Sequence, residues 1–359
     1  MYKRLLFASI LVASPAVGLT TASAHHPGIG GAGGAGPIDT IGADTLDQGQ
    51  LALSAFVEYV RLNQLSNATL LANIGNDVHG LSSIDTRTIA LAYGISSGFM
   101  VTARLPWVRR TGILEGEQDD PTEPPTIHDR GSTSGFGDVT VLGQYRFLNN
   151  KGSGTQAAAL FGFKAPTGRT GLIDPFGELF EAEFQPGSGS WDGLLGAAFS
   201  RRLDSRWTFH ANVLGVVTGT GTQDTNLGNR FLYNAAVVYR IFGETANEPH
   251  SHDMHGYAHE GPDVHTKAPP PPRPHSHIAL DGMLELNGEW HDKESRAGVI
   301  DPNSGGNTIY LSPGLRLTVE KWSGYVSAGF PITNNLNGIH PTPAWRVIGG
   351  ISVVFGPLI

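Results

Sequence analysis

Long segments in which every second side chain is apolar constrain this chain more than any other feature. Residues 278–290 show the pattern most clearly, with Leu284 and Trp290 on one face and Asp281 and Glu285 on the other. A strand places alternate side chains on opposite faces, whereas a helix would mix these two sets. The segment therefore predicts a β-strand that has one apolar and one polar face.

About 12 such segments recur along the chain, and each is long enough for a tilted strand to cross an outer membrane, which takes about 9–11 residues. Strands of soluble proteins are shorter, about 5–6 residues on average. The segments lie near residues 50–62, 84–96, 98–110, 136–148, 155–165, 192–203, 205–218, 229–242, 277–290, 306–319, 321–331 and 343–355. The pattern predicts an all-β fold, a transmembrane antiparallel β-barrel of about 12 strands.

Composition excludes several other classes of protein. The chain has no Cys, so it is neither a disulfide scaffold nor a Cys zinc module. Its net charge of −8 does not indicate nucleic-acid binding, which depends on a positively charged surface. A secreted soluble β-sandwich would also show alternating apolar and polar residues. Such a fold explains poorly the length of the segments and the lack of helical periodicity.

The N-terminal residues indicate export. Lys3 and Arg4 precede an apolar stretch over residues 5–17, and the small residues Ala22 and Ala24 fit a cleavage site. This pattern is typical of a secretory signal peptide over residues 1–24. We expect residues 25–49 to form a Gly-rich periplasmic leader and residues 50–359 to form the barrel, which together place the protein in the bacterial outer membrane.

The connections between the segments alternate between short and long. Short ones are expected near residues 96–98, 149–152, 203–205 and 320–321, and such turns face the periplasm in outer-membrane barrels. One connection breaks this alternation. A His/Pro-rich insertion over residues 243–276 follows the eighth segment, where the alternation predicts a short periplasmic turn.

Histidines concentrate in and beside this insertion, and imidazole is a good ligand for Cu, Zn and Ni ions. The candidate metal ligands are His250, His252, His255, His259, His265, His275 and His277. The alternative is a solvated low-complexity insertion whose histidines bind nothing specific. No fixed spacing defines a rigid site, so we expect modest, pH-dependent affinity.

The polar faces of the predicted strands carry charged side chains that a wet lumen would hydrate or pair. We expect the lumen to be lined by Arg104, Arg146, His210, Arg240, Asp281, Glu285, Glu289 and Arg316. A hydrolase would need a nucleophile, a base and an orienting group within reach, and His128 near Ser132 shows no such set. We therefore expect no catalytic residues and no organic cofactor.

Three motifs give the chain a family resemblance: GFGDVT at 135–140, GFKAPTG at 162–168 and QPGSGSWD at 185–192. They resemble the outer-membrane transporters grouped under the meta-pathway of phenol degradation. The resemblance implies a porin-like barrel that passes small, often hydrophobic or aromatic, compounds. The alternative function is a barrel without transport that acts as a metal-buffering or surface scaffold.

Overall fold

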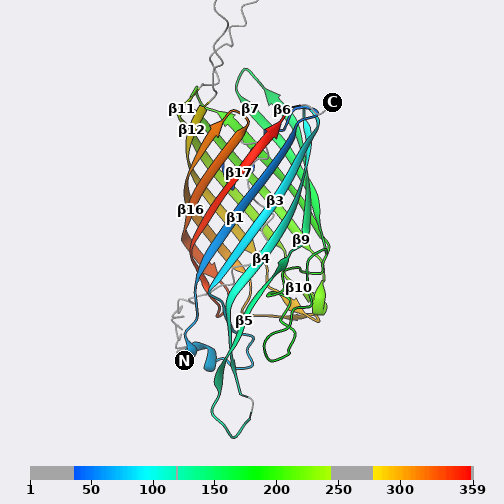
Figure 1. Ribbon diagram of the computed structural model, residues 1–359, viewed down its shortest axis with the longest axis vertical. Helices are drawn as coiled ribbons and strands as arrows, with labels where there is room; N and C mark the ends of the chain where they lie inside the picture. The colour runs from blue at the N-terminus through cyan, green and yellow to red at the C-terminus, as the bar shows by residue number, and fades with distance from the viewer. Residues whose placement is uncertain (1–35, 119, 244–277, 357–359) are drawn as a thin grey trace, which may run out of the picture.

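The chain folds into one closed barrel, shown in Figure 1 as a computed structural model that describes residues 36–118, 120–243 and 278–356. Twelve antiparallel strands form the wall. In order round the barrel they are β1 (Leu51–Asn63), β3 (Ser83–Ser96), β4 (Phe99–Glu117), β6 (Val139–Asn150), β7 (Thr155–Ala165), β8 (Asp192–Arg202), β9 (Trp207–Thr218), β11 (Arg230–Phe242), β12 (Ile278–His291), β15 (Gly306–Val319), β16 (Trp322–Leu336) and β17 (Thr342–Phe355). The predicted fold class is confirmed.

The first and last strands close the wall. β1 pairs with β17 along its whole length, from Leu51 opposite Phe355 to Asn63 opposite Thr342. Every wall strand therefore has a hydrogen-bonded neighbour on both sides, and no open sheet edge is left to face lipid.

The side chains of the wall are arranged in the opposite sense to those of a soluble protein. Large apolar side chains point outward, and Ile89 and Leu195 are 60% and 72% exposed. Polar side chains point inward, and Glu285 and Arg316 are 1% and 2% exposed. Since the outer surface is apolar and the interior polar, the outer face suits lipid and the inner face suits water or polar partners.

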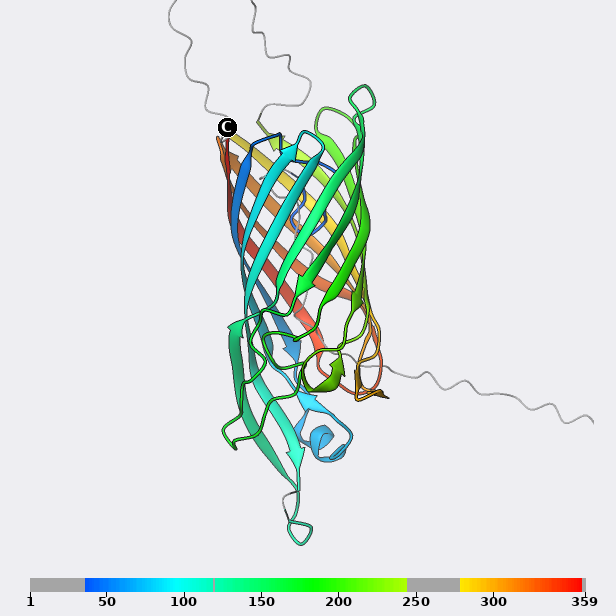
Figure 2. The same ribbon diagram turned by 90° about the vertical axis from the view of Figure 1, so that its right-hand side faces the viewer.

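The two ends of the barrel differ, as Figure 2 shows. The predicted short turns are present between β3 and β4, β6 and β7, β8 and β9, and β15 and β16. The other end carries the long connections, which contain α1 (Asn67–Leu71), β2 (His79–Gly80), β5 (Thr126–Phe136), the 3₁₀ turn η1 (Thr222–Asp224), β10 (Thr225–Asn226), β13 (Ser295–Arg296) and β14 (Val299–Ile300). No helix among the described residues is long and apolar enough to span a membrane.

The residues on either side of the His-rich insertion lie at the short-turn end. Arg206, in the turn between β8 and β9, donates through Nη1 to the carbonyls of Arg240 and Ile241 near the end of β11. The insertion thus starts at the end that carries short turns. Its histidines lie outside the described residues, as does the predicted signal peptide over 1–24.

One predicted loop is largely a hairpin. The alternation leaves residues 111–135 as a long connection between two predicted wall segments, but β4 continues to Glu117 and pairs with β5 beyond the wall (Figure 2). This part of β4 lacks an apolar face, so alternation could not reveal it. Arg130 of β5 forms ion pairs with Glu115 and Glu117 of β4, which stabilise the hairpin, and with Asp174, which lies in the connection between β7 and β8.

A charge on the outer face should destabilise the barrel. Ile89 lies midway along β3, and replacing it with Arg should lower the free energy of unfolding in phosphatidylcholine bilayers by about 2–4 kcal/mol, because the guanidinium would meet hydrocarbon. The measurement is a urea titration of refolding, with Ile89→Ala as the uncharged control. If Ile89→Arg cost no more than Ile89→Ala, the outer face would not be a lipid face.

Candidate functional site

The barrel lumen is the candidate functional site, and the luminal segment, residues 36–49, enters it with residues 37–43 buried. This segment precedes β1 and reaches from the short-turn end to the middle of the barrel, where it meets β12. The Glu285 carboxylate of β12 accepts hydrogen bonds from the backbone N–H groups of Ile38 and Thr40, both at 2.7 Å. It also accepts one from the Thr40 hydroxyl at 2.7 Å and one from the Asp39 N–H.

Other wall strands hold the next residues of the segment in the same way. Asn212 of β9 accepts a hydrogen bond from the Ile41 N–H at 2.8 Å, and the Ser200 hydroxyl of β8 accepts one from the Ala43 N–H at 2.8 Å. Gln144 of β6 donates through Nε2 to the Gly42 and Asp44 carbonyls. Residues 38–44 are therefore bound to the wall by side chains from four different strands rather than by strand pairing. Gly49, next to β1, is the residue whose backbone N–H donates to a wall backbone group, the Gly94 carbonyl of β3.

Apolar side chains of the segment cover apolar patches on the inner wall. Ile38 packs in a cluster with Phe56 and Ile348, and Ile41 packs in a cluster with Leu160 and Leu214. Ala43 joins the second cluster, and Leu46 forms a third with inward residues of β1, β3 and β4. The lumen is consequently polar with apolar patches, and residues 36–46 contact both kinds of surface.

Two arginines of the wall also bind the segment. Arg346 of β17 forms ion pairs with Asp39 at 2.8 Å and with Glu58 of β1 at 3.4 Å. Arg316 of β15 donates through Nη2 to the Pro37 carbonyl at 3.0 Å. These groups are buried, so pairing offsets the cost of removing their charges from water.

The predicted lumen residues take several positions. Asp281, Glu285, His210 and Arg316 are buried on the inner face, where Glu285 and Arg316 bind the luminal segment and His210 bonds to Ser200. Arg240 pairs with Asp281. Arg104 and Glu289 lie on the inner faces of β4 and β12, and Arg146 lies near the short-turn end, where it donates to the Ser97 carbonyl.

The sequence did not indicate that residues 36–49 enter the barrel. The preceding run of glycines has the composition of a flexible leader, and the segment has no strand periodicity. The only signal is the spacing of apolar residues at Ile38, Ile41 and Leu46. That spacing gains meaning only when the inner wall is known to carry matching apolar patches.

At the opposite end, the connection between β7 and β8 folds across the mouth of the barrel. Its Phe180 and Phe184 pack in a cluster with Leu62 of β1 and Ile84 of β3, on the far side of the wall. Arg110 of β4 donates through Nη1 to the Gln185 carbonyl at 3.0 Å. The mouth loop, residues 166–191, is therefore fixed to several strands.

The three family-like motifs meet at the base of this mouth loop. The Asp138 carboxylate accepts hydrogen bonds from the N–H and hydroxyl of Ser188 and from the Gly168 N–H. Lys164 donates to the Ser188 hydroxyl and pairs with Asp192, both at 2.7 Å. The motifs thus form a buried network that anchors the mouth loop.

Gly168 shows why glycine is needed there. A Cβ on this residue would lie 2.6 Å from the Gly187 Cα and 2.7 Å from the Gly137 carbonyl carbon, which is closer than real Cβ contacts. Each of these three glycines comes from a different motif.

Comparison with known proteins agrees with this geometry. A family model described as "Putative MetA-pathway of phenol degradation" matches residues 38–261, a range that begins within the luminal segment. The COG4313 outer membrane channel from Pseudomonas putida F1 matches 89% of this chain and 100% of its own, with 15% identity and a TM-score of 0.55. A comparison with curated protein sequences finds no match.

Two further solved structures show weaker likeness. The β domain of the Bordetella autotransporter BrkA covers 86% of this chain and 100% of its own, with 11% identity and a TM-score of 0.42. The CymD monoaromatic hydrocarbon channel covers 86% and 88%, with 8% identity and a TM-score of 0.38. The COG4313 likeness shows the barrel fold. A closed barrel with an apolar outer face and a polar interior is the form in which strands cross an outer membrane, and the predicted localisation is confirmed.

Proposed function

Because this chain belongs to the family of the MetA-pathway of phenol degradation, we propose that it is an outer-membrane channel for small hydrophobic or aromatic solutes whose lumen is gated by residues 36–49. The observation that carries the proposal is the way this segment is held. Its hydrogen bonds to Glu285, Asn212 and Ser200 come from its backbone N–H groups and from the Thr40 hydroxyl, and all of them end on wall side chains. It can therefore leave the lumen without breaking any strand pairing of the wall.

The inner wall supports the proposed class of solute. Leu142, Leu160 and Leu214 form an apolar patch that Ile41 and Ala43 cover while the segment is in place. Departure of the segment would expose this patch to the passage beside polar groups such as Asn212 and His210. A path with both kinds of surface suits a small aromatic compound, which has an apolar ring and often one polar substituent.

We also propose that the His-rich insertion binds Cu, Zn or Ni ions on the periplasmic side. The support is the density of histidines in the insertion and its start at the short-turn end, which faces the periplasm in outer-membrane barrels. Metal buffering by a barrel that carries no solute is the alternative function. Transport and metal binding are separable, because they depend on different parts of the chain.

Removing the Glu285 carboxylate should open the channel. Hydrogen bonds to a charged group are each worth about 1.5–3 kcal/mol, and Glu285→Ala removes those that hold residues 38–40. We expect single-channel recordings in planar bilayers to show at least a tenfold rise in open probability. Flux of benzoate, an aromatic anion that crosses lipid slowly, should rise in liposomes.

Glu289→Ala is the matched control for this experiment, since Glu289 lies four residues further on the same strand and face. It should leave both readouts near those of the unmodified protein. Equal conductance and benzoate flux for Glu285→Ala and the unmodified protein would contradict gating by the segment. Absence of conductance and flux in every variant would contradict the channel itself.

Deleting residues 249–276 should reduce metal binding without changing transport. We expect Zn²⁺ or Cu²⁺ titration near pH 7 to detect fewer bound ions in the deletion variant than in the full chain, because imidazole binds these ions when neutral. Benzoate flux should stay the same. Identical metal stoichiometry in the two proteins would show that the histidines are a solvated insertion.

A further inference from the structure

Charged side chains gather on one part of the outer face of the wall, near the mouth of the barrel. The members of this arginine patch occupy outward positions of their strands and are Arg61 of β1, Asp85 and Arg87 of β3, and Arg109 of β4. These three strands are neighbours in the wall, as Figure 1 shows. The other wall strands, all of which lie within the described residues, have no charged outward side chain in their mouth halves.

The register of the strands brings the four side chains of the arginine patch together. Asp85 lies directly opposite Arg109 of β4. Arg87 is the next outward residue along β3, and Arg61 lies diagonally across from Asp85, because its direct partner is Ser83. Outward positions related in these ways are about 5–8 Å apart, a distance that long side chains bridge. The three guanidinium groups can therefore approach one anion.

The arginine patch has a positive charge that its own acidic residue only partly neutralises. Arg87 donates to both oxygens of Asp85, through Nη2 at 2.9 Å and through Nε at 3.3 Å. Arg61 and Arg109 are exposed, and neither forms an ion pair with any of the described residues. Three positive charges less one negative charge leave a net charge of +2 on the patch.

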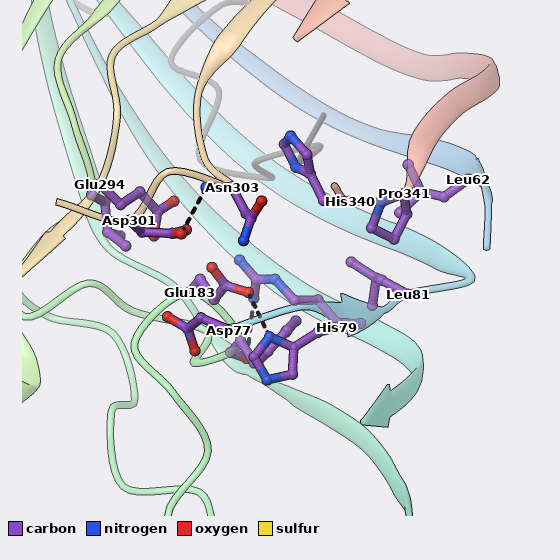
Figure 3. A pocket seen from close by; sticks show the side chains of 13 residues that line it. Leu62, Asp77, His79, Leu81, Glu183, Glu294, Asp301, Asn303, His340 and Pro341 are labelled. Atoms are coloured by element: carbon purple, nitrogen blue, oxygen red, sulfur yellow. Dashed lines mark hydrogen bonds and ion pairs between the residues drawn. The ribbon is translucent and has the colours of Figure 1, made fainter. Parts of the chain in front are cut away.

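Other acidic residues near the mouth do not neutralise the patch. Glu183 and Glu294 line a cavity on the inner side of the wall, together with Leu62 of β1 (Figure 3). Leu62 follows Arg61 directly, and successive side chains of a strand point to opposite faces of the sheet. The glutamates of the β4–β5 hairpin pair with Arg130. The arginine patch therefore presents its charge to the surroundings of the barrel.

Aromatic side chains show that the arginine patch lies at the level of lipid headgroups. The Arg87 guanidinium lies over the ring of Trp107, 5.3 Å from its centroid, and the rings of Tyr59 and Trp345 are 5.4 Å apart on the adjacent strands. Trp and Tyr concentrate where a membrane meets water. Toward the middle of the wall the next outward residue of β3 is Ile89, which is exposed and apolar. The long connections of outer-membrane barrels are external, so these headgroups belong to the outer leaflet.

We propose that Arg61, Arg87 and Arg109 bind the phosphate groups of an anionic glycolipid in the outer leaflet. Arginine binds phosphate through paired N–H donors, and basic residues beside a membrane attract anionic headgroups. The acyl chains of the same lipid would lie along the apolar face below the patch, where Ile89 and Leu105 are exposed. A free phosphate ion has no such chains, so the adjoining apolar face favours a lipid. The site lies outside the lumen and is independent of the proposed gate.

Lipid binding to the full-length protein in a nonionic detergent tests this proposal. Native mass spectrometry measures the fraction of protein that carries one molecule of diphosphorylated lipid A, or of monophosphorylated lipid A with the same acyl chains. We expect the unmodified protein to bind the diphosphorylated form more tightly. The Arg61→Gln, Arg109→Gln double variant should bind that form at least about tenfold more weakly, since it removes two cations beside the headgroup.

The matched control is the Arg201→Gln, Lys321→Gln double variant. It makes the same change in charge at two exposed positions near the short-turn end, so it should bind lipid A as the unmodified protein does. Far-UV circular dichroism should show the same strand content in all of these proteins. Benzoate flux should also be the same, because neither pair of residues lies in the lumen.

The Arg109→Gln single variant keeps the test decisive if the Arg61→Gln, Arg109→Gln protein fails to fold. Arg109 is exposed, and Gln fits the same outward position, so this change should leave the fold intact. It should still weaken the binding of diphosphorylated lipid A by about fivefold. Equal affinity of the unmodified protein and the patch variants for this lipid would overturn the site. An equal loss in the control variant, or equal affinity of the unmodified protein for the two forms of lipid A, would also overturn it.

Discussion

The requirement that every backbone N–H and C=O be paired inside lipid determines the rest of this structure. An unpaired group in hydrocarbon costs several kcal/mol, so strands can cross a membrane only as a closed barrel. The pairing of β1 with β17 meets this requirement from Leu51 to Asn63. Closure then turns alternate side chains outward to lipid and the others into a lumen, where buried charges need partners.

The luminal segment is a consequence of that second requirement. Glu285, Arg316 and Arg346 are buried in the lumen, and the backbone and side chains of residues 37–40 give them partners. The mouth loop serves the other end in a similar way, through the network of Asp138, Lys164, Ser188 and Asp192. Backbone pairing holds the wall, whereas side chains of the wall hold the luminal segment. This difference would allow the segment to move while the wall stays closed.

The sequence predicts the wall well and its contents poorly. Alternation located all twelve strands, because lipid and lumen impose it locally on each strand. It missed the outer part of the β4–β5 hairpin, which contacts neither a lipid layer nor a filled lumen. The positions of Asp39 and His79 were also missed, since their partners Arg346 and Glu181 lie more than a hundred residues away. The family-like motifs were visible, but their convergence on Asp138 depends on strand register that no local pattern encodes.

The most direct test of the account is a reversible tether between the segment and the wall. The chain has no cysteine, and the Ala43 N–H lies 2.8 Å from the Ser200 hydroxyl, so the Ala43→Cys, Ser200→Cys double variant can form a single disulfide there. Single-channel recording should show conductance in the presence of reductant and its loss under oxidising conditions, with each single-cysteine variant unaffected by either. Equal conductance of the oxidised and reduced double variant, with the disulfide verified by mass spectrometry, would contradict the account.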